Sequence, residues 1–117
     1  MNIVLEGEFP NLNQEISHAK SHFAIYAKYK KEWTWMVELQ CRTLPPIKEY
    51  PVSITFTWVT KNKRKDPDNV AFAKKYILDG LVHAGILEND SRKFIHSIQD
   101  FFATATNPYV IVEIKKV

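Results

Sequence analysis

The stretch from Lys61 to Lys93 reads KNKRKDPDNVAFAKKYILDGLVHAGILENDSRK, and the other expected elements are arranged around it. A basic run opens the stretch, and the acidic turn Asp66-Pro67-Asp68-Asn69 follows directly. Asp68 suits the N-cap of a helix, because its carboxylate can accept a hydrogen bond from a free N–H of the first turn. Gly85 suits the end of that helix, because glycine readily takes the left-handed conformation. The sequence therefore predicts one amphipathic helix between Asp68 and Gly85.

The predicted helix has an apolar face and a polar face. Apolar residues recur at the helical spacing and should form a buried stripe; they are Val70, Ala73, Ile77, Leu81 and Ala84. Asp68, Phe72, Lys75 and Asp79 share a second face, at i, i+4, i+7 and i+11. Lys75 lies roughly 10 Å along the axis from Asp68, so its side chain can reach a phosphate held near the carboxylates. A second acidic cluster, Glu88-Asn89-Asp90, follows the helix, and this association of acids with bases predicts a metal ion and a phosphate.

The acidic turn also has an ordinary structural interpretation. D-P-D-N is typical of a turn, and an aspartate that caps a helix needs no catalytic role. Basic runs are most often solvated faces. The turn does not extend to a calcium loop, because the positions that would need glycine and glutamate hold Ala71 and Ile77.

The remaining elements complete an α+β (α/β) domain. The pattern of Val52 to Thr60 alternates strictly and predicts a strand with Trp58 in the core. The predicted order is β-α-β-α-β-β, with a mixed sheet of about four strands in a single compact domain. Besides the central helix, the expected elements are a strand over 2–7, a helix over 17–42 and strands over 52–60, 94–102 and 109–114.

Composition limits the class of protein. The 117 residues suit one domain, and 45% hydrophobic with 25% charged residues is ordinary for a soluble globular protein. The net charge of +3 is compatible with a nucleic-acid partner. The single cysteine, Cys41, excludes an internal disulfide and is expected to be a buried or half-buried helix residue. No histidine is placed to activate it as a catalytic nucleophile. With no membrane-length apolar run and no signal peptide pattern, a cytoplasmic location is expected.

Several motifs in this order resemble the RusA family of Holliday junction resolvases, the crossover junction endodeoxyribonucleases common in prophages. The matching motifs are Asp66-x-Asp68-Asn69, Lys75-Tyr76-Ile77-Leu78-Asp79-Gly80-Leu81, Ala84-Gly85-Ile86-Leu87, Asn89-Asp90 and the opening Gly7-x-x-Pro10-x-x-Asn13. The resemblance covers most of the chain and is most specific over residues 64–93. The chain departs from the family at two points. Lys75 matches only across a small insertion, so Lys74 is a rival for its role, and Asn89-Asp90 stands where the family has two aspartates.

The resemblance implies a RusA-like fold and a homodimer that resolves four-way DNA junctions by paired symmetric nicks, in DNA recombination and repair. It implies Mg²⁺ as the cofactor, with Mn²⁺ as a substitute, and Asp66, Asp68 and Asp90 as catalytic metal ligands. Lys75 would contact the scissile phosphate. The helix separates Asp90 from the other two carboxylates, so tertiary folding or a second subunit must close that distance. DNA-binding residues would be Lys63, Arg64, Lys65, Lys74, Arg92 and Lys93, with support from Asn13, Asn69 and Asp79.

Two other functions fit the same residues. The chain could be a non-catalytic basic nucleic-acid-binding protein whose acidic residues only cap the helix. It could also be a metal-dependent nuclease for other branched DNA. Such an enzyme would have the same site chemistry and would differ in which DNA substrates its dimer surface accepts. Asp79 has an alternative too, because it could pair with Lys75 at i+4 as a purely structural contact.

Overall fold

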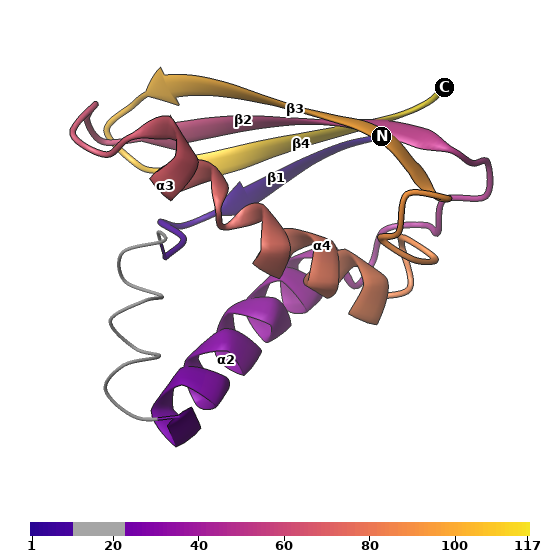
Figure 1. The fold of residues 1–117 in the computed structure, drawn as a ribbon, viewed down its shortest axis with the longest axis horizontal. Coiled ribbons are helices and arrows are strands. Elements are labelled where there is room, and N and C mark those ends of the chain that lie inside the picture. The colour runs from indigo at the N-terminus through magenta and orange to yellow at the C-terminus, as the bar shows by residue number, and fades with distance from the viewer. Residues whose placement is uncertain (11–22) are drawn as a thin grey trace.

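The computed structural model describes residues 1–10 and 23–117. These residues form one mixed four-stranded sheet with helices packed against one of its faces (Figure 1). The elements in chain order are β1 (Asn2–Glu6), α2 (Phe23–Cys41), β2 (Val52–Thr60), α3 (Pro67–Ala71), α4 (Lys74–His83), β3 (Ile95–Thr104) and β4 (Tyr109–Lys116).

The strand order of the sheet is β1-β4-β2-β3. β4 runs antiparallel to both of its neighbours, whereas β2 and β3 are parallel, so the predicted mixed sheet is confirmed. The parallel pairing puts the starts of β2 and β3 at one end of the sheet and their last residues at the other. In this register Phe56 lies beside Asp100 and Trp58 beside Phe102, so these four side chains share one face.

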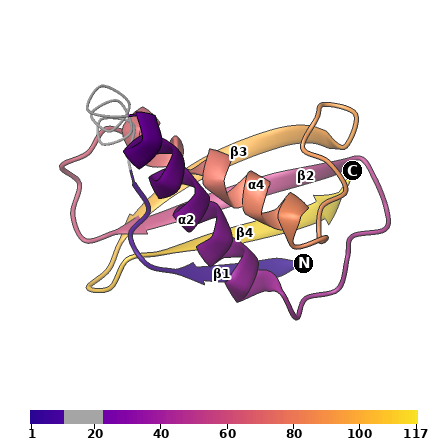
Figure 2. The same cartoon turned by 90° about the horizontal axis from the view of Figure 1, so that it is seen from below.

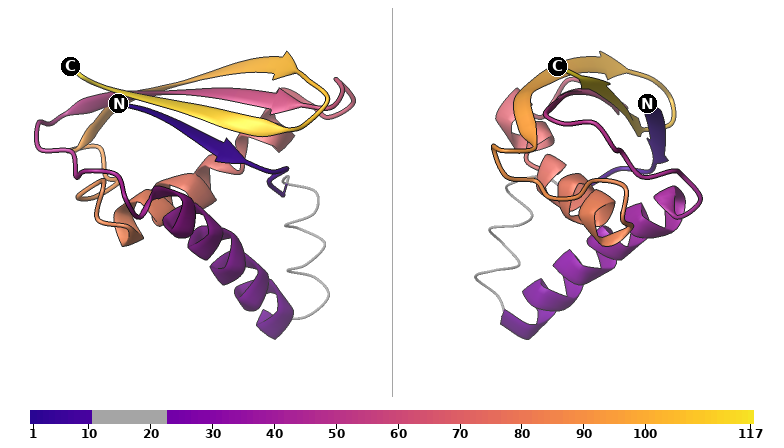
Figure 3. Two further views of the ribbon diagram at one scale, coloured as in Figure 1. Left: turned by 180° about the vertical axis from the view of Figure 1, so that it is seen from behind. Right: turned by 90° about the vertical axis from the view of Figure 1, so that its right-hand side faces the viewer.

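The core lies between that face and the helices. The alternation of β2 is confirmed, because Val52, Ile54, Phe56 and Trp58 are each at most 2% exposed. Ala73, Ile77 and Leu81 of the predicted stripe are buried as well, whereas Val70 and Ala84 are partly buried and pack against the core. Figure 2 shows α2 and α4 crossing beneath the sheet. In Figure 3 the described helices all lie on one side, and the opposite face of the sheet is uncovered.

The prediction of one continuous helix between Asp68 and Gly85 is wrong in its middle and at its start. The chain forms two helices, α3 and α4, separated at Phe72 and Ala73. Around this break the amide of Lys75 bonds to the carbonyl of Phe72 at 3.3 Å, which is the tighter i→i−3 pattern of a 3₁₀ turn. The spacing of the apolar residues continues across this turn, so the sequence pattern does not reveal the break between the two helices.

The ends of this segment differ in how well they were predicted. The N-cap is Asp66, with extended backbone, and Asp68 lies within the first turn. This corrects the expected cap: Pro67 takes the first helical position, where its fixed φ and missing N–H are tolerated. At the other end Ala84 is the C-cap and Gly85 follows with φ of +77°, as predicted.

The remaining elements agree with the sequence within a few residues, and the predicted strand over 52–60 matches β2 at both ends. The described part of the long helix runs from Phe23, so its predicted start lies outside the described residues. Cys41 is fully buried, as expected. Among the described helices, none is both long enough and apolar enough to cross a bilayer.

Helices α2 and α4 approach each other closely at Gly80. A Cβ atom placed on Gly80 would lie 2.5 Å from Cβ of Val37 and 3.0 Å from the carbonyl oxygen of Thr34. Both neighbours belong to α2, so the absence of a side chain at Gly80 sets the distance between the two helices. This contact fixes the direction of α4, whose first turn carries the two lysines of the predicted site.

Candidate functional site

An open pocket of about 570 Å³ is lined by residues of α3, of the start of α4 and of β3. It combines acidic, basic and aromatic side chains from three elements that are distant in sequence. The residues that line it are Pro67, Asp68, Ala71, Phe72, Lys74, Lys75, Asp100 and Phe102. The pocket therefore holds Asp68 and both lysines of the predicted site, together with one acid that sequence reasoning missed.

That acid, Asp100, is bonded through both carboxylate oxygens. The indole Nε1 of Trp58 donates to Oδ1 at 2.9 Å, and Nζ of Lys74 lies 2.5 Å from Oδ2. The side chains of Lys74 and Asp100 are 28% and 23% exposed, so the ion pair is largely shielded from water. Lys74 also lies over the ring of Phe56, with Nζ 5.9 Å from the ring centre. Buried or shielded charges of this kind need such partners to offset the loss of hydration.

The sheet register explains this cluster. Asp100 stands beside Phe56 on the helix-facing side of β3, and the ring of Phe56 stacks on Trp58 with centroids 5.3 Å apart. An isolated aspartate within a strand is uncommon, because aspartate is depleted there. The unusual aspartate was the signal for a functional residue within 95–104. The sequence did not reveal its partners, Lys74 and Trp58, which become apparent only in the folded sheet.

The carboxylates of Asp66 and Asp68 are exposed and largely unused by the fold. Asp66 occupies the N-cap position but makes no side-chain capping bond. Asp68 accepts one bond, at 3.0 Å, from the amide of the adjacent Asn69. Most of their oxygen lone pairs therefore remain available to an external ligand.

The two lysines of the pocket differ in environment. Lys74 is half-buried and paired, whereas Lys75 is exposed and forms no ion pair with any described residue. The alternative pairing of Lys75 with Asp79 is therefore not formed within the described residues. Asp79 does not line this pocket; it lines a separate groove between α2 and α4 together with His83 and Trp35. The turn at Phe72–Ala73 is the reason, because it breaks the helical face on which Asp68 and Asp79 were expected to align.

Asp90 lies at the opposite end of the sheet. The amide of Glu88 donates to the hydroxyl of Tyr50, just before β2, and the amide of Val52 bonds to the carbonyl of Phe94. These contacts tie the loop of Asp90 to the first residues of β2, whereas Asp66 follows its last residues. The nine residues of β2 separate the two ends by roughly 26 Å at the usual strand rise. Folding of one chain therefore does not bring Asp90 to Asp66 and Asp68.

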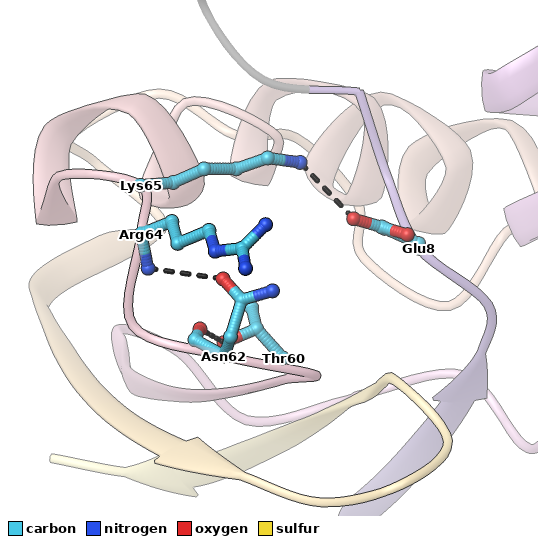
Figure 4. Close-up of polar contacts among 5 residues, drawn as sticks. All are labelled: Glu8, Thr60, Asn62, Arg64 and Lys65. Carbon is cyan, nitrogen blue, oxygen red and sulfur yellow. Dashed lines mark hydrogen bonds and ion pairs between the residues drawn. The ribbon is translucent and has the colours of Figure 1, made fainter.

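The predicted DNA-binding residues are divided between the two ends as well. Lys63, Arg64 and Lys65 lie in the exposed loop that leads from β2 to Asp66. Figure 4 shows how this loop is held: Nζ of Lys65 pairs with Glu8 at 3.0 Å, and the amide of Arg64 bonds to the side chain of Asn62 at 3.0 Å. Arg92 and Lys93 instead follow Asp90 at the far end. Asn13 lies outside the described residues.

No group of three or more histidine, cysteine, aspartate or glutamate side chains is placed to hold a metal within the described residues. Mg²⁺ in nucleotide-processing sites commonly uses only one or two carboxylates together with substrate phosphate and water. The exposed carboxylates of Asp66 and Asp68 suit that smaller donor set. Asp100 does not, because a cation there would have to displace Lys74.

No protein-family model matches the chain, and a comparison with curated proteins also finds no match. Membership of the RusA family therefore remains a prediction that rests on the motifs of residues 64–93.

Proposed function

We propose that the protein is a Mg²⁺-dependent endodeoxyribonuclease that acts on branched DNA and resolves four-way junctions in recombination and repair. The observation that carries this proposal is the pocket, in which the little-used carboxylate of Asp68 lies with the ammonium groups of Lys74 and Lys75. Asp66 adjoins it with a carboxylate that caps no helix. The resemblance of residues 64–93 to the RusA family supplies the reaction.

The chemistry assigns a separate role to each kind of residue. Hydrolysis of a phosphodiester needs a nucleophilic water and stabilisation of the negative charge that develops on phosphorus. Bound Mg²⁺ supplies much of both, and Mn²⁺ can substitute for it. Asp66 and Asp68 would hold the metal, and a pocket lysine would contact the scissile phosphate. Lys63 and Arg64 would hold neighbouring phosphates, which positions DNA without reading its sequence.

A homodimer belongs to the same proposal. Two identical sites related by a two-fold axis match the symmetry of a four-way junction and allow two symmetric nicks. The position of Asp90 favours a dimer as well, since within one chain it stands at the far end from Asp66 and Asp68. In this proposal Asp90 acts from the partner subunit.

Replacing Asp68 with Asn tests the enzyme proposal directly. Asn keeps the size of the side chain and removes the charge that a metal needs, so cleavage of a synthetic four-way junction should fall by about 100-fold or more. Binding of the same junction should change little. The measurement compares strand cleavage with Mg²⁺ and with EDTA, alongside a linear duplex of the same sequence.

Asp79→Asn is the matched control, because Asp79 lies on the neighbouring helix α4 but does not line the pocket. The Asp79→Asn variant should cleave like the unmodified protein. Paired nicks in the junction that need Mg²⁺ and Asp68 would support the proposal. Tight, metal-independent binding without any cleavage by the unmodified protein would reject it.

The second candidate function is a non-catalytic nucleic-acid-binding protein. The observation that favours it is the lack of a three-carboxylate metal group within the described residues. The same assay decides, because a binding protein retains its affinity after Asp68→Asn and never cuts. Adding flap and fork substrates to the assay separates a junction resolvase from a nuclease for other branched DNA.

A further inference from the structure

We propose that the pocket lined by Asp68, Lys74 and Lys75 takes one nucleotide that has left the stack of the double helix, and that its base stacks on the ring of Phe102. The identity of the substrate, branched DNA, comes from the proposed function, on which this proposal rests. The nucleotide site itself is argued from the pocket alone, and it explains how a branch would be distinguished from a continuous duplex.

Phe102 presents an aromatic ring to solvent at the wall of the pocket, where the residue is 47% exposed. The register of β2 and β3 places it beside Trp58, which is only 2% exposed. Among the described residues, no other aromatic ring pairs with that of Phe102. A single exposed apolar residue is ordinary, but this ring is free on one side and stands in a pocket with charged neighbours. It is therefore available to stack on an external group.

Positive charge lies close to this ring. Asp100 and Phe102 are two residues apart on the same face of β3, which is roughly 7 Å at the usual strand rise. Lys74 pairs with Asp100, and the exposed Lys75 lines the same pocket. Proteins bind unpaired nucleic acid with this combination, in which the ring takes a base and the positive charge takes the backbone. One extended nucleotide can thus place its base on Phe102 and its phosphate at the ammonium groups.

The size of the pocket suits one nucleotide rather than a duplex. Its volume is about 570 Å³, and sites for small ligands typically span roughly 300–1,000 Å³. Pro67, Ala71 and Phe72 supply the rest of its apolar lining. A base inside a continuous duplex has both faces covered by its neighbours, so Phe102 can stack only on a base that has left the helix.

This requirement would select branched DNA. Taking a base out of a paired duplex is costly, and the cost is least where the base is already unpaired. Nucleotides at a branch point can lose a stacking neighbour, so they would enter the pocket most readily. Stacking accepts every base, and the site would therefore recognise the unstacked state rather than a sequence.

Photochemical cross-linking tests the stacking contact without any cleavage. Iodouracil is placed at an unpaired nucleotide in the centre of a synthetic four-way junction, and the complex is irradiated in EDTA. Light breaks the carbon–iodine bond, and the uracil carbon replaces a hydrogen of the ring that lies against it, with loss of hydrogen iodide. Peptide mass spectrometry should locate the adduct on Phe102. Phe101 is the matched control, because it is 54% exposed but faces the opposite side of the sheet, and it should stay unlabelled.

Binding measured in EDTA gives the contribution of the ring to affinity. Phe102→Ala should weaken binding of the same junction by about 10-fold, as expected for one base stacked on an aromatic side chain. It should leave the affinity for linear duplex unchanged, and Phe101→Ala should change neither affinity. An abasic nucleotide at the unpaired position should cost the unmodified protein the same factor and cost Phe102→Ala nothing further, because the base and the ring are the two partners of one contact.

Two further variants separate stacking from charge and from folding. Phe102→Ala should keep the salt dependence of binding, because it neutralises as many phosphates as the unmodified protein, whereas Lys75→Met should lower that dependence. Phe102→Trp retains an aromatic ring and should restore the affinity for the junction that Phe102→Ala loses.

The outcomes separate the nucleotide site from the nuclease. An adduct that avoids Phe102, an equal loss of affinity for junction and duplex, an abasic penalty that persists in Phe102→Ala, or a failure of Phe102→Trp to restore binding would each overturn the nucleotide site. A protein that cuts junctions yet gives any of these results would remain a nuclease with another basis for its selectivity. A protein that never cuts but gives the Phe102 adduct and the abasic result would reject the proposed function and leave the nucleotide site standing.

Discussion

Lys74 has three hydrogen-bond donors on its ammonium group, and Asp100 takes one of them in the folded chain. Two donors remain for a phosphate, and the side chain is already ordered by Asp100 and by the ring of Phe56. A lysine that is ordered on folding loses less side-chain entropy when it binds its ligand. In the proposed reaction this favours Lys74 over the exposed Lys75 as the residue that would contact the scissile phosphate.

Exchanging each lysine for methionine tests that choice. Lys74→Met should lower kcat by about 100-fold, as expected when a positioned catalytic group is lost, and Lys75→Met should mainly raise KM. Asp100→Asn keeps an acceptor for Trp58 but weakens the ion pair with Lys74, so the kcat of this variant should lie between those of the two lysine variants. Comparable losses of kcat in both lysine variants would contradict the assignment. Labelling of surface amines gives a readout independent of cleavage, since Lys74 should react more slowly than Lys75 until Asp100 is replaced.

The fold clearly displaces the pKa of the buried Cys41. Burial raises the pKa of its thiol from 9.0 to about 11, because the thiolate would lose its hydration. A raised pKa in the folded state contributes stability that is complete below about pH 9 and is lost as the pH rises through about 11.

Unfolding in denaturant at several pH values measures this contribution. Cys41→Ala removes the group, so the difference in unfolding free energy between the two proteins should shrink by on the order of 2 kcal/mol between neutral pH and pH 11. Lysine titration affects both proteins equally and cancels in the difference. A difference that stays constant with pH would show that the thiol is not desolvated.

The site residues show what a sequence can and cannot reveal at this scale. The proximity of Asp68 to the two lysines was predictable, because they stand in a short motif, and all three line the pocket; their roles stay predictions. Asp100 was not predictable, since its partners reach it through the pairing of β2 with β3 and the approach of α4. Contacts set by strand register leave no local periodicity to detect.

At the scale of the elements, the segment from Asp66 to Gly85 was predicted in its type and in its end but not in its break. The buried stripe continues through the turn at Phe72–Ala73, so hydrophobic spacing is satisfied by one helix or by two. The strands were predicted closely because alternation in β2 and the flanking turns define their limits. The break matters for the proposed function, because it separates Asp79 from the pocket.

Gly80 sets the packing of α4 against α2, and Gly80→Ala should destabilise the fold by about 1–3 kcal/mol through overpacking. Gly85→Ala provides the comparison. No atom lies within 4 Å of a Cβ placed there, so its cost of about 1 kcal/mol should come from the positive φ alone. Unfolding in denaturant gives both values.

A second change separates crowding from backbone strain. Val37→Ala removes the atoms that meet the new side chain, so it should recover part of the loss in Gly80→Ala. Gly85→Asn should be better tolerated than Gly85→Ala, since asparagine accepts the left-handed conformation. A neutral Gly80→Ala would mean that the two helices can separate at no cost.

At the scale of the whole molecule, the charged groups implied in DNA cleavage are divided between the two ends of the sheet. Asp66, Asp68 and the basic loop over residues 61–65 occupy one end, and Asp90 with Arg92 and Lys93 occupies the other. The sequence predicted the mixed sheet, but it could not predict this separation, which follows from the parallel pairing of β2 and β3. In the proposed function, a two-fold dimer would let both groups act on one phosphate.

β4 is synthesised last among the described strands, yet it lies inside the sheet between β1 and β2. β1 has no other described neighbour, so it must wait for residues 109–116 to leave the ribosome. At ordinary translation rates that delay is roughly ten seconds. β2, β3 and the intervening helices can associate earlier, but the sheet closes only after translation has passed residue 116. A stall between β3 and β4 would therefore leave a chain in which the flanks of both β1 and β2 are open to aggregation.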